Sequence, residues 1–287
     1  MSLGGSNRPV TLLRREFTGS RVRGDLLTQE AENTPPDSRG VPRPQPVAPT
    51  WHTIVFLVVM LGLSILQYVA ILLQPDLIQK AGQLPHLTAA YVESIVYEWI
   101  LVGYVWFFGL RRRKVTIAEL VGGRWQRWLD FWRDIGIAVL FWIVVGAVLA
   151  GLSYALHFSG EEAAEFLLPR TAAQMVVFLV LAACAGFCEE LVFRGYLQRQ
   201  FLAWTGNVAV AVVLQALVFG SAHLYQGPKA VIVISVYGAL FGALAAMRRS
   251  LRPGMMQHFG QDAVSGLAGR SALKALKAAH HLQILRF

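Results

Sequence analysis

The sequence contains seven apolar stretches, most of them long enough to cross a lipid bilayer. A membrane-spanning helix needs about 20 predominantly apolar residues. The stretches cover residues 53–73, 89–110, 135–158, 172–204, 208–224, 231–247 and 255–267. Backbone polar groups have no water to bind inside lipid, so such stretches fold as α-helices. The sequence therefore predicts an all-α fold, a polytopic membrane helix bundle with about six to seven transmembrane helices.

The composition excludes an ordinary soluble globular protein. Hydrophobic residues make up 55% of the 287 residues and charged residues only 15%, whereas soluble domains have about 25% charged residues. The two cysteines exclude a disulfide scaffold. Lys and Arg (26) outnumber Asp and Glu (17), but much of this basic charge flanks apolar stretches, where it reports membrane topology. We therefore expect the lipid bilayer as a partner and no nucleic acid.

Residues 1–50 differ in composition from the rest of the chain. They are rich in arginine and proline and show no apolar periodicity, which predicts a disordered tail. The segment does not resemble a signal peptide, because no apolar stretch follows its basic residues before residue 51. We therefore predict a disordered cytoplasmic tail over residues 1–50 and a membrane domain over residues 51–287.

The distribution of basic residues predicts the orientation. If the amino terminus is inside, residues 111–133, Arg199 and residues 248–252 share the inner side, which is the positive-inside pattern. This pattern favours an integral protein of a bacterial inner (plasma) membrane with a cytoplasmic N-terminus. Seven full crossings would place the basic residues after 267 outside. Either the rule fails there or the last stretch does not fully cross.

Residues 115–134 have a different pattern, in which tryptophan and arginine alternate. The tryptophans are Trp125, Trp128 and Trp132, and the arginines are Arg124, Arg127 and Arg133. This pattern predicts an amphipathic helix that lies in the headgroup region of the membrane.

Ionisable side chains occur inside several apolar stretches. Each of them costs at least about 2.5–3.5 kcal/mol on insertion scales, so its presence indicates a structural or functional role. These residues are Glu93, Glu98, Glu189, Glu190, Arg194, His223, His258 and Asp262.

The spacing of these residues suggests two arrangements. Glu190 and Arg194 are four residues apart, which predicts an ion pair on one helix face and leaves Glu189 on another side, free to act as a base. Glu189 and His223 are equidistant from Gly206. If the chain turns there as an antiparallel hairpin, both side chains lie at one depth and could activate a water molecule together.

Three short patterns resemble the signature of a known family. They are Glu189-Glu190-x-x-x-Arg194, Phe219-x-x-x-His223 and His258-x-x-x-Asp262. Together they resemble the CPBP family of CAAX prenyl endopeptidases and bacteriocin-processing, Abi-like intramembrane proteases. The resemblance covers about residues 172–266.

The resemblance implies hydrolysis of a peptide bond inside the membrane. Glu189 and His223 would activate the water, and His258 with Asp262 would stabilise the oxyanion. The Glu190–Arg194 pair would provide structural support. The substrate would be a peptide or protein, with or without a lipid modification. The family commonly has Asn where this chain has Asp262.

The need for a metal stays open at this point. Glu189, His223 and His258 have the chemistry of a zinc site, but the sequence lacks a His-Glu-x-x-His motif. We therefore favour catalysis without a cofactor, with a divalent metal such as zinc as the alternative.

A non-catalytic membrane protein of the same fold is the second functional hypothesis. It would be a scaffold, an immunity factor or a proton-coupled transporter, because intramembrane carboxylates also serve proton paths. A protease should gather Glu189, His223 and His258 within about one water molecule of each other. A proton relay would instead connect Glu98 to Glu190 through the bilayer.

Overall fold

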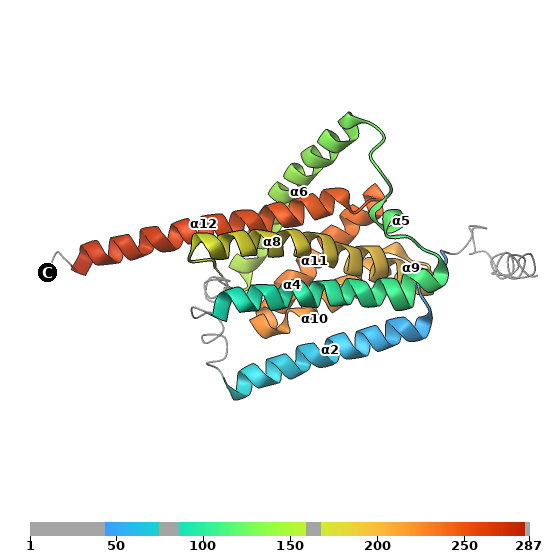
Figure 1. Cartoon of the computed structure of the whole chain (residues 1–287), viewed down its shortest axis with the longest axis horizontal. Helices are drawn as coiled ribbons and strands as arrows, with labels where there is room; N and C mark the ends of the chain where they lie inside the picture. Colours follow the sequence, from blue (N-terminus) through green and yellow to red (C-terminus); the bar gives the residue numbers. More distant parts are fainter. Residues whose placement is uncertain (1–43, 75–85, 159–167, 285–287) are drawn as a thin grey trace, which may run out of the picture. The chain divides into compact units, whose positions relative to one another are not determined.

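The computed structural model describes residues 44–74, 86–158 and 168–284, with the side chains of His86 and of residues 270–284 left out. The chain divides into two units, residues 1–45 and residues 46–287. The predicted disordered tail lies almost entirely outside the described residues. All helices in the described ranges belong to the second unit, which is an all-helical membrane bundle (Figure 1).

Each predicted apolar stretch is helical over most of its length, but α6 begins seven residues earlier and α12 extends seventeen residues further than predicted. The longer ones are α2 (Thr50–Leu73), α4 (His86–Tyr104), α6 (Trp128–Ala155), α8 (Ala172–Glu189), α10 (Val208–Ala222), α11 (Pro228–Arg248) and α12 (Arg252–Ile284). The shorter ones are η1 (Val105–Gly109), η2 (Leu110–Arg113), α5 (Ile117–Val121), η3 (Glu190–Leu197), α9 (Gln198–Thr205) and η4 (Leu224–Gln226).

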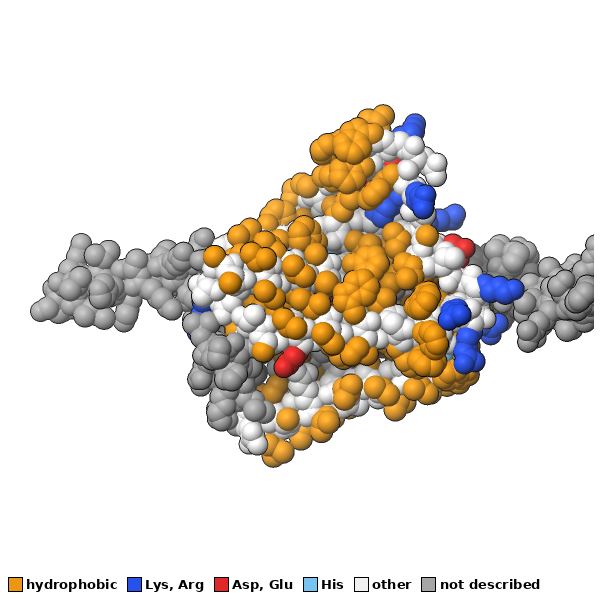
Figure 2. Space-filling view, viewed as in Figure 1, with side chains coloured by type: hydrophobic (Ala, Val, Ile, Leu, Met, Phe, Trp, Pro, Cys, Tyr) orange, Lys and Arg blue, Asp and Glu red, His pale blue; other side chains and the backbone are white. Residues whose placement is uncertain are grey.

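Five helical segments of the described chain are long and apolar enough to cross a membrane. They are Thr50–Leu73, Leu87–Arg113, Trp128–Ala155, Ala172–Thr205 and Pro228–Arg248. Of the other two predicted stretches, residues 208–224 form the shorter apolar helix α10 and residues 255–267 lie in α12, and neither is among these five candidate spans. The outer surfaces of the long helices carry exposed apolar side chains, such as Leu66 (64% exposed) and Leu140 (64%). Figure 2 shows this apolar surface in orange, which suits contact with lipid.

The segment from α8 to α9 is the most buried part of the bundle. α8 packs against α4 on one side and α12 on the other, and α10 packs against α11 (Figure 1). The contact between α8 and α12 depends on Gly186, because a Cβ atom there would lie 2.9 Å from the backbone nitrogen of Phe259. Small residues allow membrane helices to approach this closely.

The helix changes its geometry directly after Glu189. The π-helix η3 (Glu190–Leu197) follows α8, and all eight of its residues are buried. A π-helix has i→i+5 hydrogen bonds and occurs frequently at functional sites. The change therefore lies at the predicted Glu189-Glu190 doublet.

The predicted turn between the fourth and fifth stretches is confirmed. Gly206 ends α9 with a φ of +65°, and the Asn207 side chain accepts hydrogen bonds from the nitrogens of Ala209 and Val210 at the start of α10. Glycine adopts this left-handed conformation without steric cost, and asparagine is a preferred N-cap residue.

The predicted amphipathic helix over residues 115–134 differs in the structure. A capping box of Thr116 and Glu119 starts the short helix α5, which ends at Gly122. Gly122 (φ +100°) and Gly123 (φ +76°) then turn the chain, and Trp128 begins the spanning helix α6. The prediction of one continuous helix was wrong because two consecutive left-handed glycines interrupt it.

Basic segments that are distant in the sequence meet at one end of the bundle. The carboxylate of Asp134, which is buried, accepts a hydrogen bond from Trp125 Nε1 at 2.9 Å and forms ion pairs with Arg248 (3.6 Å) and Arg252 (3.4 Å). Arg199 donates to the carbonyl oxygens in α5. Figure 2 shows Lys and Arg side chains gathered at this end.

Candidate active site

The imidazole of His258 lies at the centre of a buried polar cluster between α8, η3 and α12. Its Nδ1 donates a hydrogen bond to Glu190 Oε1 at 3.1 Å. Its Nε2 lies 3.6 Å from Glu189 Oε2 and 3.8 Å from Asp262 Oδ2. The structure therefore brings together four of the six predicted site residues around one ring.

The ion pair predicted from the spacing of Glu190 and Arg194 is present. Nη1 of Arg194 lies 3.0 Å from Glu190 Oε1, and both side chains are almost fully buried. The guanidinium group lies over the rings of Phe219 (4.3 Å) and Phe241 (5.1 Å). Such cation–π contacts compensate part of the cost of burying the charge. Because Glu190 also binds His258, the pair links η3 to α12.

His223 lies directly after α10, and its contacts are with aromatic rings and backbone. Its Nδ1 donates to the carbonyl oxygen of Phe219 at 2.9 Å, so a neutral His223 keeps the lone pair of Nε2 free. In the described part of the chain, His223 forms no hydrogen bond to Glu189 or His258. Phe219 and Tyr237 connect the two histidines, because Phe219 packs against His223 and Tyr237 packs against His258.

A family model matches this part of the chain. Residues 171–264 match the model described as type II CAAX prenyl endopeptidase, Rce1-like. Residues 171–264 form an Rce1-like domain of the CAAX prenyl endopeptidase (CPBP) family. No curated protein and no solved structure matches the chain.

The CPBP domain contains all six predicted site residues. It begins one residue before α8 and ends in the first turns of α12. The family resemblance predicted from the three motifs is therefore confirmed, with nearly the predicted boundaries. The helices α2, α4 and α6 lie outside the matched residues.

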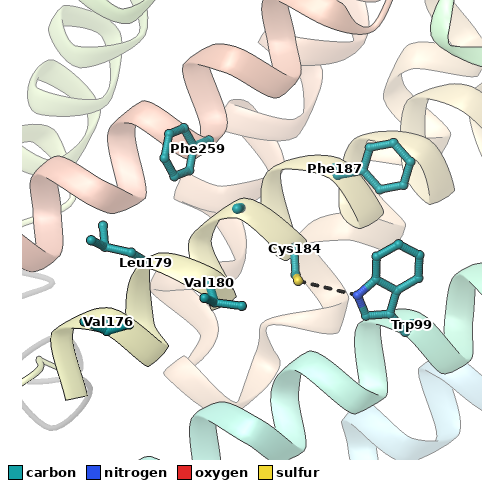
Figure 3. Close-up of a pocket in the computed structure, with 8 residues that line it drawn as sticks. Trp99, Val176, Leu179, Val180, Cys184, Phe187 and Phe259 are labelled. Atoms are coloured by element: carbon teal, nitrogen blue, oxygen red, sulfur yellow. Dashed lines mark hydrogen bonds between the residues drawn. The ribbon is translucent and has the colours of Figure 1, made fainter. Parts of the chain in front are cut away.

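An apolar pocket of about 620 Å³ opens beside the polar cluster, between α4, α8 and α12 (Figure 3). Trp99 Nε1 donates to Cys184 Sγ at 3.4 Å across it. The pocket is lined by Trp99, Val176, Leu179, Val180, Ala183, Cys184, Phe187 and Phe259. Trp99 and Phe259 are the chain neighbours of Glu98 and His258, so the pocket lies on the same helices as these two residues, on a face about 100° from their side chains.

The described residues do not fit a metal site. No group of three or more His, Cys, Asp or Glu side chains in the described ranges is arranged to hold a metal ion. The alternative site of Glu189, His223 and His258 is thus not assembled, and no step below uses a metal.

Three residues near the cluster received no role from the sequence motifs. The carboxyl group of Glu98 lies within hydrogen-bonding reach of that of Glu189. Tyr225 accepts a hydrogen bond from Gln226 at 2.9 Å and lies within electrostatic range of Glu189, Glu98 and Asp262. The ring of Tyr237 lies 5.7 Å from that of His258. The sequence indicated a role for Glu98, because it is an ionisable residue inside an apolar stretch. Nothing in the sequence singled out Tyr225 or Tyr237.

Proposed function

We propose that this protein is an intramembrane endopeptidase of the CAAX-protease type. It would hydrolyse a peptide bond with a water molecule activated by Glu189 and a histidine. The observation that carries the proposal is the 3.6 Å separation of Glu189 Oε2 and His258 Nε2 in a buried polar cluster of a CPBP domain. This separation is too long for a good hydrogen bond, but one water molecule can bond to both atoms at about 2.8 Å.

The proposed reaction begins with proton transfer from this water to Glu189. The water oxygen then attacks the carbonyl carbon of the substrate and creates an oxyanion. Glu189 returns the proton to the amide nitrogen, and the carbon–nitrogen bond breaks. The products are a carboxylic acid and an amine, and Glu189 is a carboxylate again.

The contacts of His258 and His223 suggest a different catalytic role for each of them. The sequence paired Glu189 with His223, but the imidazole beside Glu189 Oε2 is that of His258. We therefore assign His258 to the water, held in place by Glu190 and with Asp262 near its Nε2. His223, in its protonated form, would stabilise the oxyanion from the end of α10.

The apolar pocket supports a substrate that arrives from the lipid side. Its lining is formed by aromatic and aliphatic side chains of three helices, and such surfaces bind apolar segments. The substrate would be a peptide or protein with an apolar or lipid-modified segment.

The basic end of the bundle supports the proposed orientation. Arg199, Arg248, Arg252 and the helix α5 are connected at this end by hydrogen bonds and ion pairs. Under the positive-inside rule this end faces the cytoplasm of a bacterial inner membrane. The short apolar helix α10 would then add a sixth crossing to the five long segments, which returns the chain to the cytoplasmic side at Arg248.

The test uses the purified full chain in lipid nanodiscs and an internally quenched peptide. One version of the peptide carries a prenylated cysteine followed by three residues, and another lacks the prenyl group. Glu189→Gln should lower cleavage at least about 100-fold, because the base is lost, without changing the unfolding temperature. Glu93→Gln, at an exposed position of α4, is the matched control and should cleave normally. Full activity of Glu189→Gln would refute the role of Glu189.

One observation favours a non-catalytic protein of the same fold as the second candidate. The close approach of the carboxyl groups of Glu98 and Glu189 would suit the start of a proton path. Proton uptake by sealed vesicles that contain the protein, combined with no cleavage of either peptide, would support this candidate over the protease.

A further inference from the structure

Glu98 lies on α4, outside the CPBP domain, yet it is turned into the bundle. Its exposed fraction is 9%, whereas its chain neighbours Tyr97 and Trp99 are 42% and 50% exposed. α4 packs against α8, which carries Glu189 at its last residue. A carboxyl group buried in a lipid-facing helix requires a partner, because an isolated buried charge is very costly.

The partner of Glu98 is another carboxyl group. Its side chain lies within hydrogen-bonding reach of Glu189, and Cys184 and Asp262 are near enough to act on it electrostatically. Oε2 of Glu98 is buried and has no donor among the described groups. A carboxylate can only accept hydrogen bonds. A hydrogen bond between Glu98 and Glu189 therefore requires a proton on one of them.

The balance of charges in the cluster also requires a proton. Four carboxyl groups lie near two cations: Glu98, Glu189, Glu190 and Asp262 against Arg194 and His258. With all groups charged, the cluster would carry an excess of two negative charges even when His258 is protonated. One proton in the Glu98–Glu189 pair removes half of this excess. Burial disfavours the charged form, and the side chain of Glu189 keeps 15% exposure, so the proton belongs on Glu98.

We propose that Glu98 is a positioning residue, which holds a proton and donates it in a hydrogen bond to the carboxylate of Glu189. This inference rests on the proposed function of Glu189 as the base. The hydrogen bond would keep Glu189 charged, fix the rotation of its carboxylate and leave one oxygen directed to the water beside His258. The CPBP domain would thus depend on a residue from the helix that packs beside it.

The choice of substitution separates this role from others. Glu98→Gln keeps a neutral donor of nearly the same shape, so cleavage of the quenched peptide should stay within about threefold of the unchanged protein. Glu98→Ala removes the donor, and kcat should fall about tenfold or more with little change in KM, because only the activated carboxylate is affected. Glu93→Gln and Glu93→Ala on the same helix are the matched controls. Equal losses in Glu98→Gln and Glu98→Ala, or full activity in Glu98→Ala, would overturn the proposal.

Infrared spectroscopy tests the proton without any substrate. The unchanged protein should show the carbonyl band of a buried, protonated carboxylic acid. This band should disappear in Glu98→Gln and remain in Glu93→Gln and Glu189→Gln. A band that persists in Glu98→Gln, or one that disappears in Glu189→Gln alone, would contradict a proton on Glu98. Because this measurement needs no cleavage, a failure of the proposed function and a failure of this inference remain distinguishable.

Discussion

Oε1 of Glu190 accepts a hydrogen bond from Nδ1 of His258 at 3.1 Å, across 68 positions of the sequence. The same oxygen lies 3.0 Å from Nη1 of Arg194. The second glutamate of the doublet therefore has two tasks: it neutralises a buried arginine, and it fixes the imidazole of α12. The ring is thereby held with Nε2 directed to Glu189 and Asp262.

Glu190→Gln should destabilise the protein and abolish cleavage. Loss of the carboxylate leaves Arg194 buried without a counter-charge, which costs about 3–5 kcal/mol. The measurement is the unfolding temperature in detergent together with peptide cleavage. The double variant Glu190→Leu/Arg194→Leu should recover stability, because no unpaired charge remains, but should stay inactive, because position 190 then has no acceptor for the hydrogen bond from His258. Recovery of activity in the double variant would contradict the anchoring role.

Gly186→Ala should separate α8 from α12. The new Cβ atom would lie 2.9 Å from the backbone nitrogen of Phe259 and 3.1 Å from the carbonyl oxygen of Met255, so the helices must move apart at a cost of about 1–3 kcal/mol. His258 is the neighbour of Phe259, and cleavage should fall with stability. Gly103→Ala on α4 is the control, because a Cβ atom there has no neighbour within 4 Å. An unfolding temperature for Gly186→Ala equal to that of the control would show that the helices do not depend on this contact.

Asp262→Asn should retain most of the activity, whereas Asp262→Leu should not. Asp262 Oδ2 lies 3.8 Å from His258 Nε2, and an asparagine keeps a polar oxygen at the same place while matching the residue that is common in the family. Leucine removes the polar group beside the ring, and we expect kcat to fall about tenfold or more. Kinetics of both variants on the same peptide provide the measurement. If the asparagine variant were as inactive as the leucine variant, the charge of Asp262 would be essential.

Removal of divalent metals should leave cleavage unchanged. The described residues offer no group of three ligands arranged for a metal. The assay compares the purified protein before and after dialysis against a strong chelator, with added zinc as the second arm. Activity that disappears with the chelator and returns with zinc would contradict this prediction and would indicate that Glu189, His223 and His258 bind zinc together.

Much of the fold could be predicted because membrane helices are defined locally. Long apolar stretches predicted the helices, and the turn before α10 followed from Gly206 and Asn207, which cap neighbouring helices. The spacing of Glu190 and Arg194 also predicted their ion pair. Each of these features depends on residues a few positions apart.

The arrangement within the site could not be predicted in the same way, because it depends on contacts between distant helices. The hydrogen bond from His258 to Glu190 and the contact of Glu98 with Glu189 each join two separate helices. The hairpin argument correctly placed a turn at Gly206, but it could not show that the ring beside Glu189 belongs to α12. The amphipathic pattern of residues 115–134 likewise did not predict that the helix is interrupted at Gly122 and Gly123.

The wide turns of η3 make the length of this segment critical. The π-helix follows directly after Glu189 and contains Glu190 and Arg194. Each residue of an α-helix turns the chain by about 100°. Loss of a single codon between positions 190 and 197 would allow ordinary helical winding, and residues four apart in this segment, such as Glu190 and Arg194, would then lie in a different relative direction. Natural variants of this chain should therefore accept substitutions in η3 far more readily than changes in its length.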